Sequence, residues 1–281
     1  MDLSENTDLS WLSRLIGDMR SVVRDRDLLM VGAMARDLLL QYGSGVRVRR
    51  ATTDVDLAFA VVSWDEFGAF RNALLRSGLF NDSRHEHRLL HKGGLAIDLI
   101  PYGGVEDDAG QIHWPATENL MSVLGYAEAR ATAVEIVLPD DQRISTVSLP
   151  MLAVMKIVAW PDRHLIQPRK DASDLMLILR NYLHGKKADR LYAGAAHLLE
   201  ADDFDFEFAA AWMAGSDAAA SIASSSADPG RLLGVVREIL KSETDPDGQL
   251  HLIGECGVEP SLALRLLQSF SDGISGEVEK E

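Results

Sequence analysis

The residues with the clearest chemical use in this 281-residue sequence are acids that stand alone inside apolar segments. Asp54 and Asp56 alternate with Val55 and Leu57, so a strand would carry both carboxylates on one face. Asp is disfavoured in strands and neighbouring carboxylates repel each other, which indicates a cationic partner such as a divalent metal ion. For one acid alone, a strand-edge residue that faces water is the simpler explanation.

A third acid, Asp98, lies in a second apolar stretch, Leu95–Ile100. If this stretch pairs beside the first strand, Asp98 joins Asp54 and Asp56 in a cluster suited to Mg²⁺ or Mn²⁺. Because all three acids have the same apolar context, a shared metal site explains them better than three unrelated surface positions.

Gly32 stands between an apolar run, Leu28–Val31, and a helical stretch that begins near Met34. A glycine lets the backbone approach a ligand, and the start of a helix offers free N–H groups to a phosphate. Arg36 either reaches such a phosphate or pairs with Asp37. A tight turn by itself also accounts for the glycine.

Lys156 lies in an apolar helical stretch, where an unpaired ammonium is costly. It either extends to water or faces a phosphate or a carboxylate. Asp171 and Asp174 are three residues apart and share a helical face. A position near the helix start also explains Asp171, and a surface pair with Lys170 also explains Asp174.

The secondary structure expected to position these residues changes near residue 148, from strands mixed with helices to helices alone. Strands are expected at 28–31, 53–62, 86–92, 95–100, 133–138 and 143–147, and helices at 8–24, 34–42 and 64–77. The pair Gly93-Gly94 is expected to form the turn of a hairpin. Later helices are expected at 148–160 (capped by Ser148), 169–183, 187–199, 205–221, 229–241 and 259–271, with a flexible connection at 221–230.

This order predicts an α+β fold. Residues 1–148 would form a domain with a mixed β-sheet flanked by helices, and residues 149–281 an all-helical domain.

Several of these motifs resemble those of known enzymes. Gly32-Ala33, Arg36, the run Thr53–Leu57 and Asp98 together resemble the active-site pattern of the polymerase-β-like nucleotidyltransferase superfamily. The run Val31–Leu39 is similar to the head of the CCA-adding enzymes. Arg169–Leu175 resembles the R-x-K-D-x-x-D-L motif of the AbiEii/AbiGii (type IV) toxin nucleotidyltransferases, whose preceding helix carries a lysine that Lys156 matches.

The resemblance implies Mg²⁺-dependent (or Mn²⁺-dependent) transfer of a nucleoside monophosphate from an NTP to an acceptor hydroxyl. Residues 1–148 would then be the nucleotidyltransferase catalytic domain, and residues 149–185 would contribute to the active site from the helical domain. The implied metal ligands are Asp54, Asp56 and Asp98; the nucleotide-binding residues are Gly32, Ala33, Arg36 and Lys156; and the catalytic residues are Asp98, Lys156, Asp171 and Asp174.

The resemblance also implies RNA, in particular a tRNA 3′ end, as the acceptor, and a toxin with a separately encoded antitoxin protein as its partner. Basic groups at Arg47–Arg50 and Arg84–Lys92 are placed to hold RNA, or are ordinary solvated surface. Transfer to a small molecule or a protein is an alternative. A catalytically poor NTP- or partner-binding protein is another, favoured by Ala33 and Leu152, where the family has Ser or Gly and an acid.

Composition narrows the protein class. The formal net charge is −15, with the excess of acids concentrated after residue 190, so the basic groups that remain are local. The single cysteine, Cys256, excludes a disulfide framework and a Cys-rich zinc site. His85, His87 and His91 lack the helical spacing of a metal motif. Without a basic-then-apolar leader or an apolar run of ~18 residues, a cytoplasmic protein with no membrane partner is expected.

Overall fold

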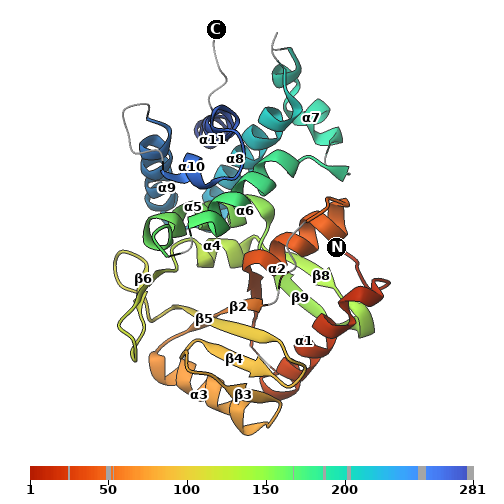
Figure 1. Cartoon of the computed structure of the whole chain (residues 1–281), viewed down its shortest axis with the longest axis vertical. Helices are drawn as coiled ribbons and strands as arrows, with labels where there is room; N and C mark the ends of the chain where they lie inside the picture. The colour runs from red at the N-terminus through yellow and green to blue at the C-terminus, as the bar shows by residue number, and fades with distance from the viewer. Residues whose placement is uncertain are drawn as a thin grey trace. The chain divides into compact units, whose positions relative to one another are not determined.

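The computed structural model in Figure 1 describes residues 1–24, 26–48, 52, 54–166, 168–185, 188–200, 204–245 and 251–276. The chain divides into two compact units. The sheet unit comprises Met1–Leu38 and Val48–Ser148, and the helical unit comprises Leu39–Arg47 and Leu149–Glu281. The domain division expected from the sequence stays a prediction, and the compact units differ from it in the placement of Leu39–Arg47.

A mixed β-sheet forms the centre of the sheet unit. Its seven strands are β1 (Leu29–Val31), β2 (Asp54–Val61), β3 (Phe80–Asp82), β4 (Arg88–His91), β5 (Ala96–Gly103), β8 (Val134–Val137) and β9 (Arg143–Thr146). Their order across the sheet is β3-β4-β5-β2-β1-β9-β8. β2 runs parallel to β5 and antiparallel to β1, whereas β1 runs parallel to β9. The strands β6 (Gln111–His113) and β7 (Leu120–Ser122) form a separate pair.

Among the described residues of this unit, the α-helices are α1 (Ser10–Val22), α2 (Gly32–Asp37), α3 (Trp64–Arg76) and α4 (Tyr126–Ala131). The Ser63 side chain accepts a hydrogen bond from the Glu66 N–H and so caps α3. Phe67 and Phe70 of α3 stack on Phe59 of β2, with ring centroids 6.0 and 4.1 Å away. This aromatic packing fixes α3 to one face of β2.

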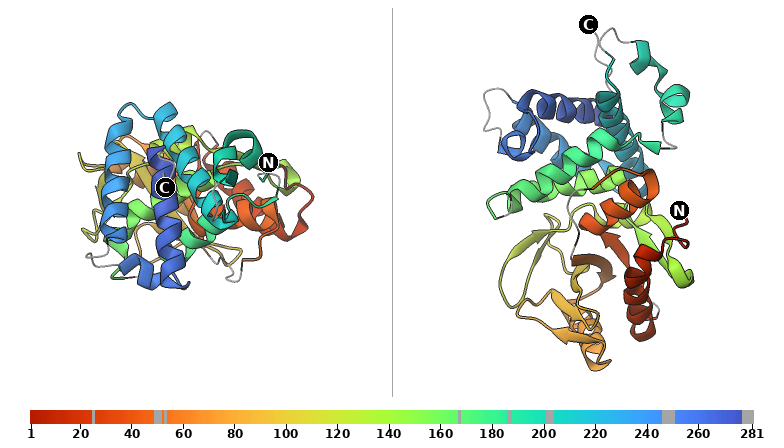
Figure 2. Two further views of the ribbon diagram at one scale, coloured as in Figure 1. Left: turned by 90° about the horizontal axis from the view of Figure 1, so that it is seen from above. Right: turned by 45° about the vertical axis from the view of Figure 1, so that its right-hand side comes forward.

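The helical unit contains α5 (Leu149–Arg163), α6 (Pro168–Asn181), α7 (Asp189–Gly194), α8 (Phe206–Ser225), α9 (Pro229–Thr244), α10 (His251–Glu255) and α11 (Pro260–Ser275). Figure 2 shows α8, α9 and α11 as neighbouring helices of one bundle. The segment Leu39–Arg47 packs into the same unit, and a Cβ on Gly185 would lie 3.6 Å from Ser44 Cα.

The predicted α+β class is confirmed: a mixed sheet with helices is followed by a chain segment built of helices. One expected helix end is wrong, because α5 continues through Pro161 to Arg163. A proline this close to the end of a helix removes only one backbone hydrogen bond from the last turn. The expected cap by Ser148 is also not made, since its Oγ is buried without a hydrogen-bond partner in the described part of the chain.

The flexible connection expected at 221–230 is mostly helix. α8 continues to Ser225, and α9 begins at Pro229, where the Asp228 side chain accepts from the Arg231 N–H. Small residues extend α8 because they let it pack closely against α11. No helix of the described residues is both long and apolar enough to cross a membrane.

Two glycines set the distance between α8 and α11. A Cβ on Gly273 of α11 would lie 2.0 Å from the Trp212 carbonyl oxygen, and one on Gly215 of α8 would lie 2.1 Å from the Phe270 carbonyl oxygen. Both obstacles are backbone atoms, which cannot rotate away. The two helices therefore approach as closely as their backbones allow.

The variant Gly273→Ala should lower the free energy of unfolding by about 1–3 kcal/mol, because α8 and α11 must separate to admit the methyl group. Urea unfolding followed by circular dichroism measures the change. Gly234→Ala in α9 is the matched control, since no atom lies within 4 Å of its added Cβ. The control should be neutral or more stable by up to about 1 kcal/mol. Equal stability of the two variants would contradict the close approach.

Candidate functional site

Three adjacent strands, β4, β5 and β2, bring charged side chains into one row on the sheet. Asp56 of β2 is paired with Asp98 of β5, and Asp98 is paired with Arg88 of β4. On its other side Asp56 is paired with the last residue of β1, directly before Gly32. Because partners in register project from the same face, Arg88, Asp98 and Asp56 form one row. Asp54, two residues before Asp56, lies on the same face.

The sequence of β2 explains why both acids lie on this face. Val55 and Leu57 have no exposed surface, whereas Asp54 and Asp56 are half-buried. Phe59 continues the buried side and packs against α3. α3 therefore covers the face opposite the two carboxylates and leaves theirs for other contacts.

Gly32 brings the backbone at the start of α2 against Asp56. Its φ of +70° is a left-handed conformation that residues with side chains rarely adopt. A Cβ at this position would lie 2.0 Å from Asp56 Oδ2. Only glycine meets both requirements, so the turn and the carboxylate are placed together.

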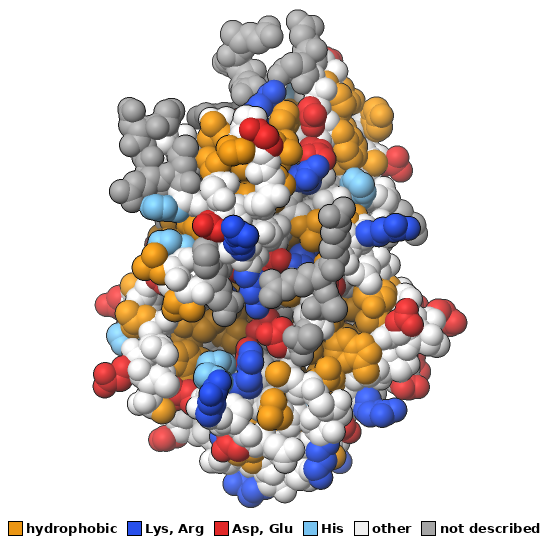
Figure 3. All heavy atoms as spheres, viewed as in Figure 1, with side chains coloured by type: hydrophobic (Ala, Val, Ile, Leu, Met, Phe, Trp, Pro, Cys, Tyr) orange, Lys and Arg blue, Asp and Glu red, His pale blue; other side chains and the backbone are white. Residues whose placement is uncertain are grey.

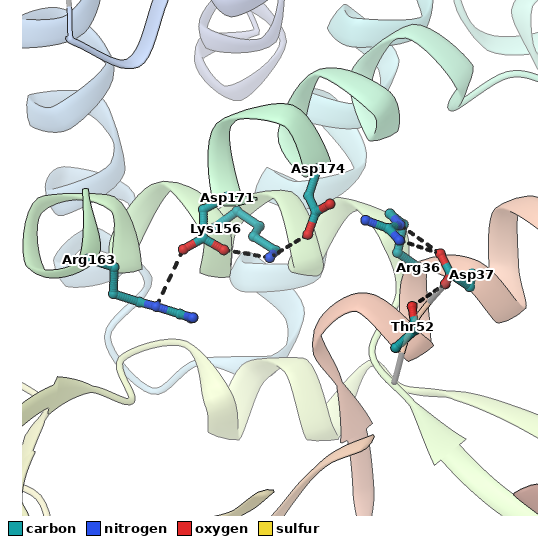
Figure 4. Close-up of polar contacts among 7 residues, drawn as sticks. All are labelled: Arg36, Asp37, Thr52, Lys156, Arg163, Asp171 and Asp174. Carbon is teal, nitrogen blue, oxygen red and sulfur yellow. Dashed lines mark hydrogen bonds and ion pairs between the residues drawn. The ribbon is translucent and has the colours of Figure 1, made fainter. Parts of the chain in front are cut away.

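The other residues of this turn expected to bind nucleotide are buried: Ala33 is 8% exposed and Arg36 is 3% exposed. Figure 4 shows that Arg36 points toward Asp37, to which its Nε and Nη2 donate at 2.8 and 2.5 Å. The Thr52 hydroxyl donates to the other oxygen of the same carboxylate. Of the two alternatives for Arg36, the structure shows the pair with Asp37; a phosphate contact stays a prediction.

Arg88 holds the third acid of the row. Its Nε and Nη2 donate to the two carboxylate oxygens of Asp98 at 2.6 and 2.7 Å, which is a bidentate pair. Its Nη2 also lies 3.5 Å from Asp54 Oδ2. The hydrogen bonds to Asp98 raise the pKa of Arg88 above its ordinary value against the effect of burial, and the charges of Asp98, Asp54 and Asp56 add to the shift. Arg88 thus offsets part of the negative charge of the row through its contacts with Asp98 and Asp54.

The donor chemistry of this face fits a divalent cation that prefers oxygen ligands. Asp54 and Asp56 present carboxylates on one half-buried face, as Mg²⁺ and Mn²⁺ require. Asp98, the third expected ligand, has both oxygens bonded to Arg88. Within the described residues, no three Asp, Glu, His or Cys side chains are arranged so that they could hold a metal ion. The arrangement therefore fits an ion held by two carboxylates of the row.

The expected site residues of the helical unit form a cluster of their own. Lys156 Nζ of α5 donates to Asp171 Oδ1 at 2.6 Å and to Asp174 Oδ2 at 2.8 Å, both from α6. All three side chains are buried. Arg163 Nε lies 3.5 Å from the second oxygen of Asp171. Figure 4 shows Lys156 between the two carboxylates, so of its alternatives the structure shows the carboxylate contact.

Burial and charge oppose each other in this cluster. Burial by itself lowers the pKa of Lys156, but the charges of Asp171 and Asp174 outweigh it and raise the pKa above its ordinary value. For Asp171 burial raises the pKa, and the charges of Lys156 and Arg163 outweigh it and leave the pKa below its ordinary value. Lys156 and Asp171 are therefore both charged at neutral pH. The active-site roles expected for Lys156, Asp171 and Asp174 stay predictions.

The three clustered histidines are not arranged as metal ligands in the described part of the chain. His85 and His87 stack with ring centroids 5.6 Å apart. His91 is buried, and its Nε2 lies 2.8 Å from Asp18 Oδ2 on α1. The Gly93 N–H donates to its Nδ1, so Nε2 carries the proton and donates to Asp18. His91 thus fixes the end of β4 to α1.

Sequence reasoning missed the part that Arg88 plays. It placed Arg88 in a basic group with Arg84 and Lys92, whereas the pairing of β4 with β5 sets it opposite Asp98. The length of the hairpin loop determines this register, and Gly93-Gly94 fits a two-residue or a three-residue loop.

Comparisons with known proteins do not assign the chain to a family. No family model matches the chain, and no curated protein matches its sequence. Among solved structures, the chain is similar to the Thermotoga maritima CCA-adding enzyme complexed with tRNA, at 14% sequence identity over 98% of this chain and 82% of that chain, with a TM-score of 0.24. A TM-score this low does not establish a shared arrangement of elements. The resemblance to the AbiEii/AbiGii toxins stays a prediction.

Proposed function

We propose that this protein is a Mg²⁺-dependent nucleotidyltransferase that moves a nucleoside monophosphate from an NTP to an acceptor hydroxyl. The observation that carries the proposal is the row on the sheet: Asp54 and Asp56 on one face of β2, Asp98 beside them, and the Gly32 turn against Asp56. Carboxylates grouped on one face are costly unless they have a task that needs their charge.

Each part of the row has a defined role in this proposal. Asp54 and Asp56 would hold the Mg²⁺ ion, which supplies charge neutralisation and alignment for the triphosphate. The Gly32 turn allows the backbone to lie against the phosphates. Asp98 is the proposed base for the acceptor hydroxyl, and Arg88 fixes its orientation through two hydrogen bonds.

The proposed acceptor is RNA, in particular a tRNA 3′ end. Figure 3 shows Lys or Arg, His and acidic side chains gathered over β4 and β5 on one face of the sheet unit. Arg84 and Lys92, which precede and follow β4 in the sequence, are exposed and can contact phosphates. The sequence resemblance alone supports a toxin-like enzyme whose activity a partner antitoxin would block.

Incubation with each of the four α-³²P-labelled NTPs, total tRNA and Mg²⁺ tests the function. Wild-type protein should label tRNA with one or two of the NTPs, and Asp54→Asn/Asp56→Asn should reduce the label to background because the ion loses both carboxylates. Asp65→Asn is the control, since Asp65 is an exposed acid of α3 on the opposite side of β2. It should label tRNA at the wild-type rate.

Failure of the wild-type protein to label tRNA would reject RNA as the acceptor. Assays with small hydroxyl compounds and with proteins would then test the other transferase alternatives. The position of Arg88 on Asp98 supports a further alternative, a protein that binds NTP without rapid turnover. A Mg²⁺-dependent rise in melting temperature with an NTP, without transfer to any acceptor, would identify that case.

A further inference from the structure

A series of aromatic rings leads from the interior of the sheet unit to its surface beside β4. Trp114 is buried, and its ring centroid lies 5.6 Å from that of Phe67 on α3 and 5.4 Å from that of His87. His87 is half-buried, and the His85 ring lies 5.6 Å from it with 30° between the two planes. His85 is exposed, and among the described residues no further ring lies against it. The histidine stack, formed by His85, His87 and Trp114, therefore ends in solvent at an aromatic ring.

Hydrogen bonds fix the backbone that carries the two histidines. The Glu86 carboxylate accepts from the Ala116 N–H at 3.1 Å and from the Thr117 hydroxyl at 3.0 Å, which joins this segment to the loop after β6. The His85 carbonyl oxygen accepts from the Arg88 N–H at 3.0 Å. His85 is thus an exposed ring on a held backbone, and a ligand that stacks on it has little chain to order.

The histidine stack lies at the Asp98 end of the row. His87 directly precedes Arg88, and its carbonyl oxygen accepts from the N–H of Leu99, the residue after Asp98, at 2.8 Å. Burial lowers the pKa of His87, and the nearby charge of Asp98 is the strongest of the opposing effects, so the ring is neutral at neutral pH. The strand order β4-β5-β2-β1 sets the Gly32 turn, which follows β1, at the other end of the row.

We infer that the histidine stack binds the terminal nucleobase of an RNA acceptor, with the base against His85 and the ribose hydroxyl directed toward Asp98. This inference rests on the proposed function, because Asp98 is the group proposed to act on that hydroxyl. Unpaired RNA bases are commonly recognised by stacking on aromatic side chains, histidine included. Every base has an aromatic face, so the stack favours a nucleotide acceptor without selecting its sequence.

Position and charge distinguish the acceptor base from the base of the NTP. Asp54, Asp56 and the Gly32 turn, which are proposed to hold the ion and the triphosphate, lie toward β1, whereas the stack lies toward β4. Arg84 and Lys92, which precede and follow β4 in the sequence, are exposed and can contact acceptor phosphates. Figure 3 shows Lys or Arg, His and acidic side chains gathered over β4 and β5, the combination that phosphate, base and hydroxyl require.

Two short single-stranded RNAs that differ only at the 3′ end test the inference. One ends in adenosine and the other in an abasic residue, and a 5′ fluorophore reports binding by anisotropy without NTP. Wild-type protein should bind the RNA with the terminal base about 5- to 150-fold more tightly, which corresponds to about 1–3 kcal/mol of stacking. His85→Ala should remove this preference, and His85→Phe, which keeps an aromatic ring, should retain it. His113→Ala is the matched control, since His113 is an exposed histidine of β6 outside the stack.

Transfer kinetics give a second measurement of the same variants. His85→Ala should raise the KM for the RNA acceptor by about the factor that it loses in binding, and should leave the KM for the NTP unchanged. A raised KM for the NTP with an unchanged KM for RNA would assign the stack to the NTP base and overturn the inference.

The outcomes separate the inference from the proposed function. If the wild-type protein binds both RNAs equally, or if His85→Ala keeps the preference, the inference is wrong, and the labelling assay with the four NTPs still decides the proposed function. If the preference is present and lost in His85→Ala, but no acceptor is labelled with any NTP, the proposed function is rejected and the stack is confirmed as an RNA-binding site.

Discussion

Replacing Lys156 with methionine should destabilise the helical unit by about 3–5 kcal/mol, the usual cost of removing one partner from a buried ion pair. Methionine nearly fills the space of the lysine stem, so packing changes little. The loss arises because Asp171 and Asp174 keep buried carboxylates without the ammonium that they share. Arg163, at 3.5 Å from Asp171 alone, replaces only part of that charge.

Urea unfolding followed by the fluorescence of Trp160 and Trp212, both in this unit, measures the change. Lys241→Met is the matched control, because Lys241 is an exposed lysine on α9 of the same unit. It should change the free energy of unfolding by less than about 0.5 kcal/mol. Equal stability of the two variants would mean that the Lys156 cluster contributes little.

The dependence of stability on pH distinguishes charge from packing. The raised pKa of Lys156 gives stability that is complete below the unfolded value of about 10.4 and is lost as pH rises through the folded pKa. The lowered pKa of Asp171 gives stability that is complete above about 3.9 and is lost as pH falls through the folded pKa. In Lys156→Met the Asp171 carboxylate loses the main charge that lowers its pKa, so burial then favours its protonated form. The variant should therefore become more stable on mild acidification, whereas the wild type should not.

The variant Gly32→Ala should lower transferase activity by about 100-fold or more, the scale expected when a catalytic group is displaced by about 1 Å. The added methyl group would lie 2.0 Å from Asp56 Oδ2, so the carboxylate or the turn must move. The backbone adds to this effect, because alanine at a φ of +70° costs about 1–2 kcal/mol.

Gly45→Ala separates these two causes. Gly45 has a φ of +71°, nearly that of Gly32, but no atom lies within 4 Å of its added Cβ. The control should therefore lose stability through backbone strain and keep its activity per folded molecule. Activity per folded molecule, measured by NTP transfer with the folded fraction from circular dichroism, is the quantity to compare. Equal activities of the two variants would show that the contact of Gly32 with Asp56 has no catalytic importance.

Strand geometry correctly predicted that the Asp54 and Asp56 carboxylates lie on one face of their strand. Alternation along Asp54–Leu57 set both carboxylates on one face, and the structure buries the apolar residues between them on the other. The strand of Asp98 also pairs beside this strand, the condition for the three acids to lie together, with Asp98 directly opposite Asp56. These features follow from local pattern, because a period of two residues is fixed by the backbone itself.

Which residue of β4 lies opposite Asp98 depends on whether the loop between β4 and β5 has two or three residues. A two-residue turn at Gly93-Gly94 would set Arg88 opposite Leu99. The side chains of one strand would then lie on the other face of the sheet. The structure instead has a three-residue loop, in which the His91 N–H donates to the Leu95 carbonyl oxygen. This register sets Arg88 opposite Asp98. Glycine suits both loops, so composition alone could not choose between them.

The contacts of Lys156 could not be predicted for a different reason. Its partners come from the next helix, 15 and 18 residues away along the chain, so no helical periodicity connects them. The sequence indicated only that the ammonium extends to water or faces a phosphate or a carboxylate. Short elements such as β3, β6, β7 and α10 were missed as well, since three to five residues carry too little periodicity to predict.

The packing of Leu39–Arg47 in the helical unit has a consequence during synthesis of the chain. This segment packs with helices that begin at Leu149, so its partners are synthesised about 100 residues later, or about 5–20 s at ordinary rates of translation. During that interval Leu40 and Val46, both buried in the finished protein, have no helical unit to cover them. A chain truncated after Ser148 never acquires these helices, so Leu40 and Val46 stay without them. One truncation therefore cannot separate the two units, because Leu39–Arg47 of the helical unit lies between the two segments of the sheet unit.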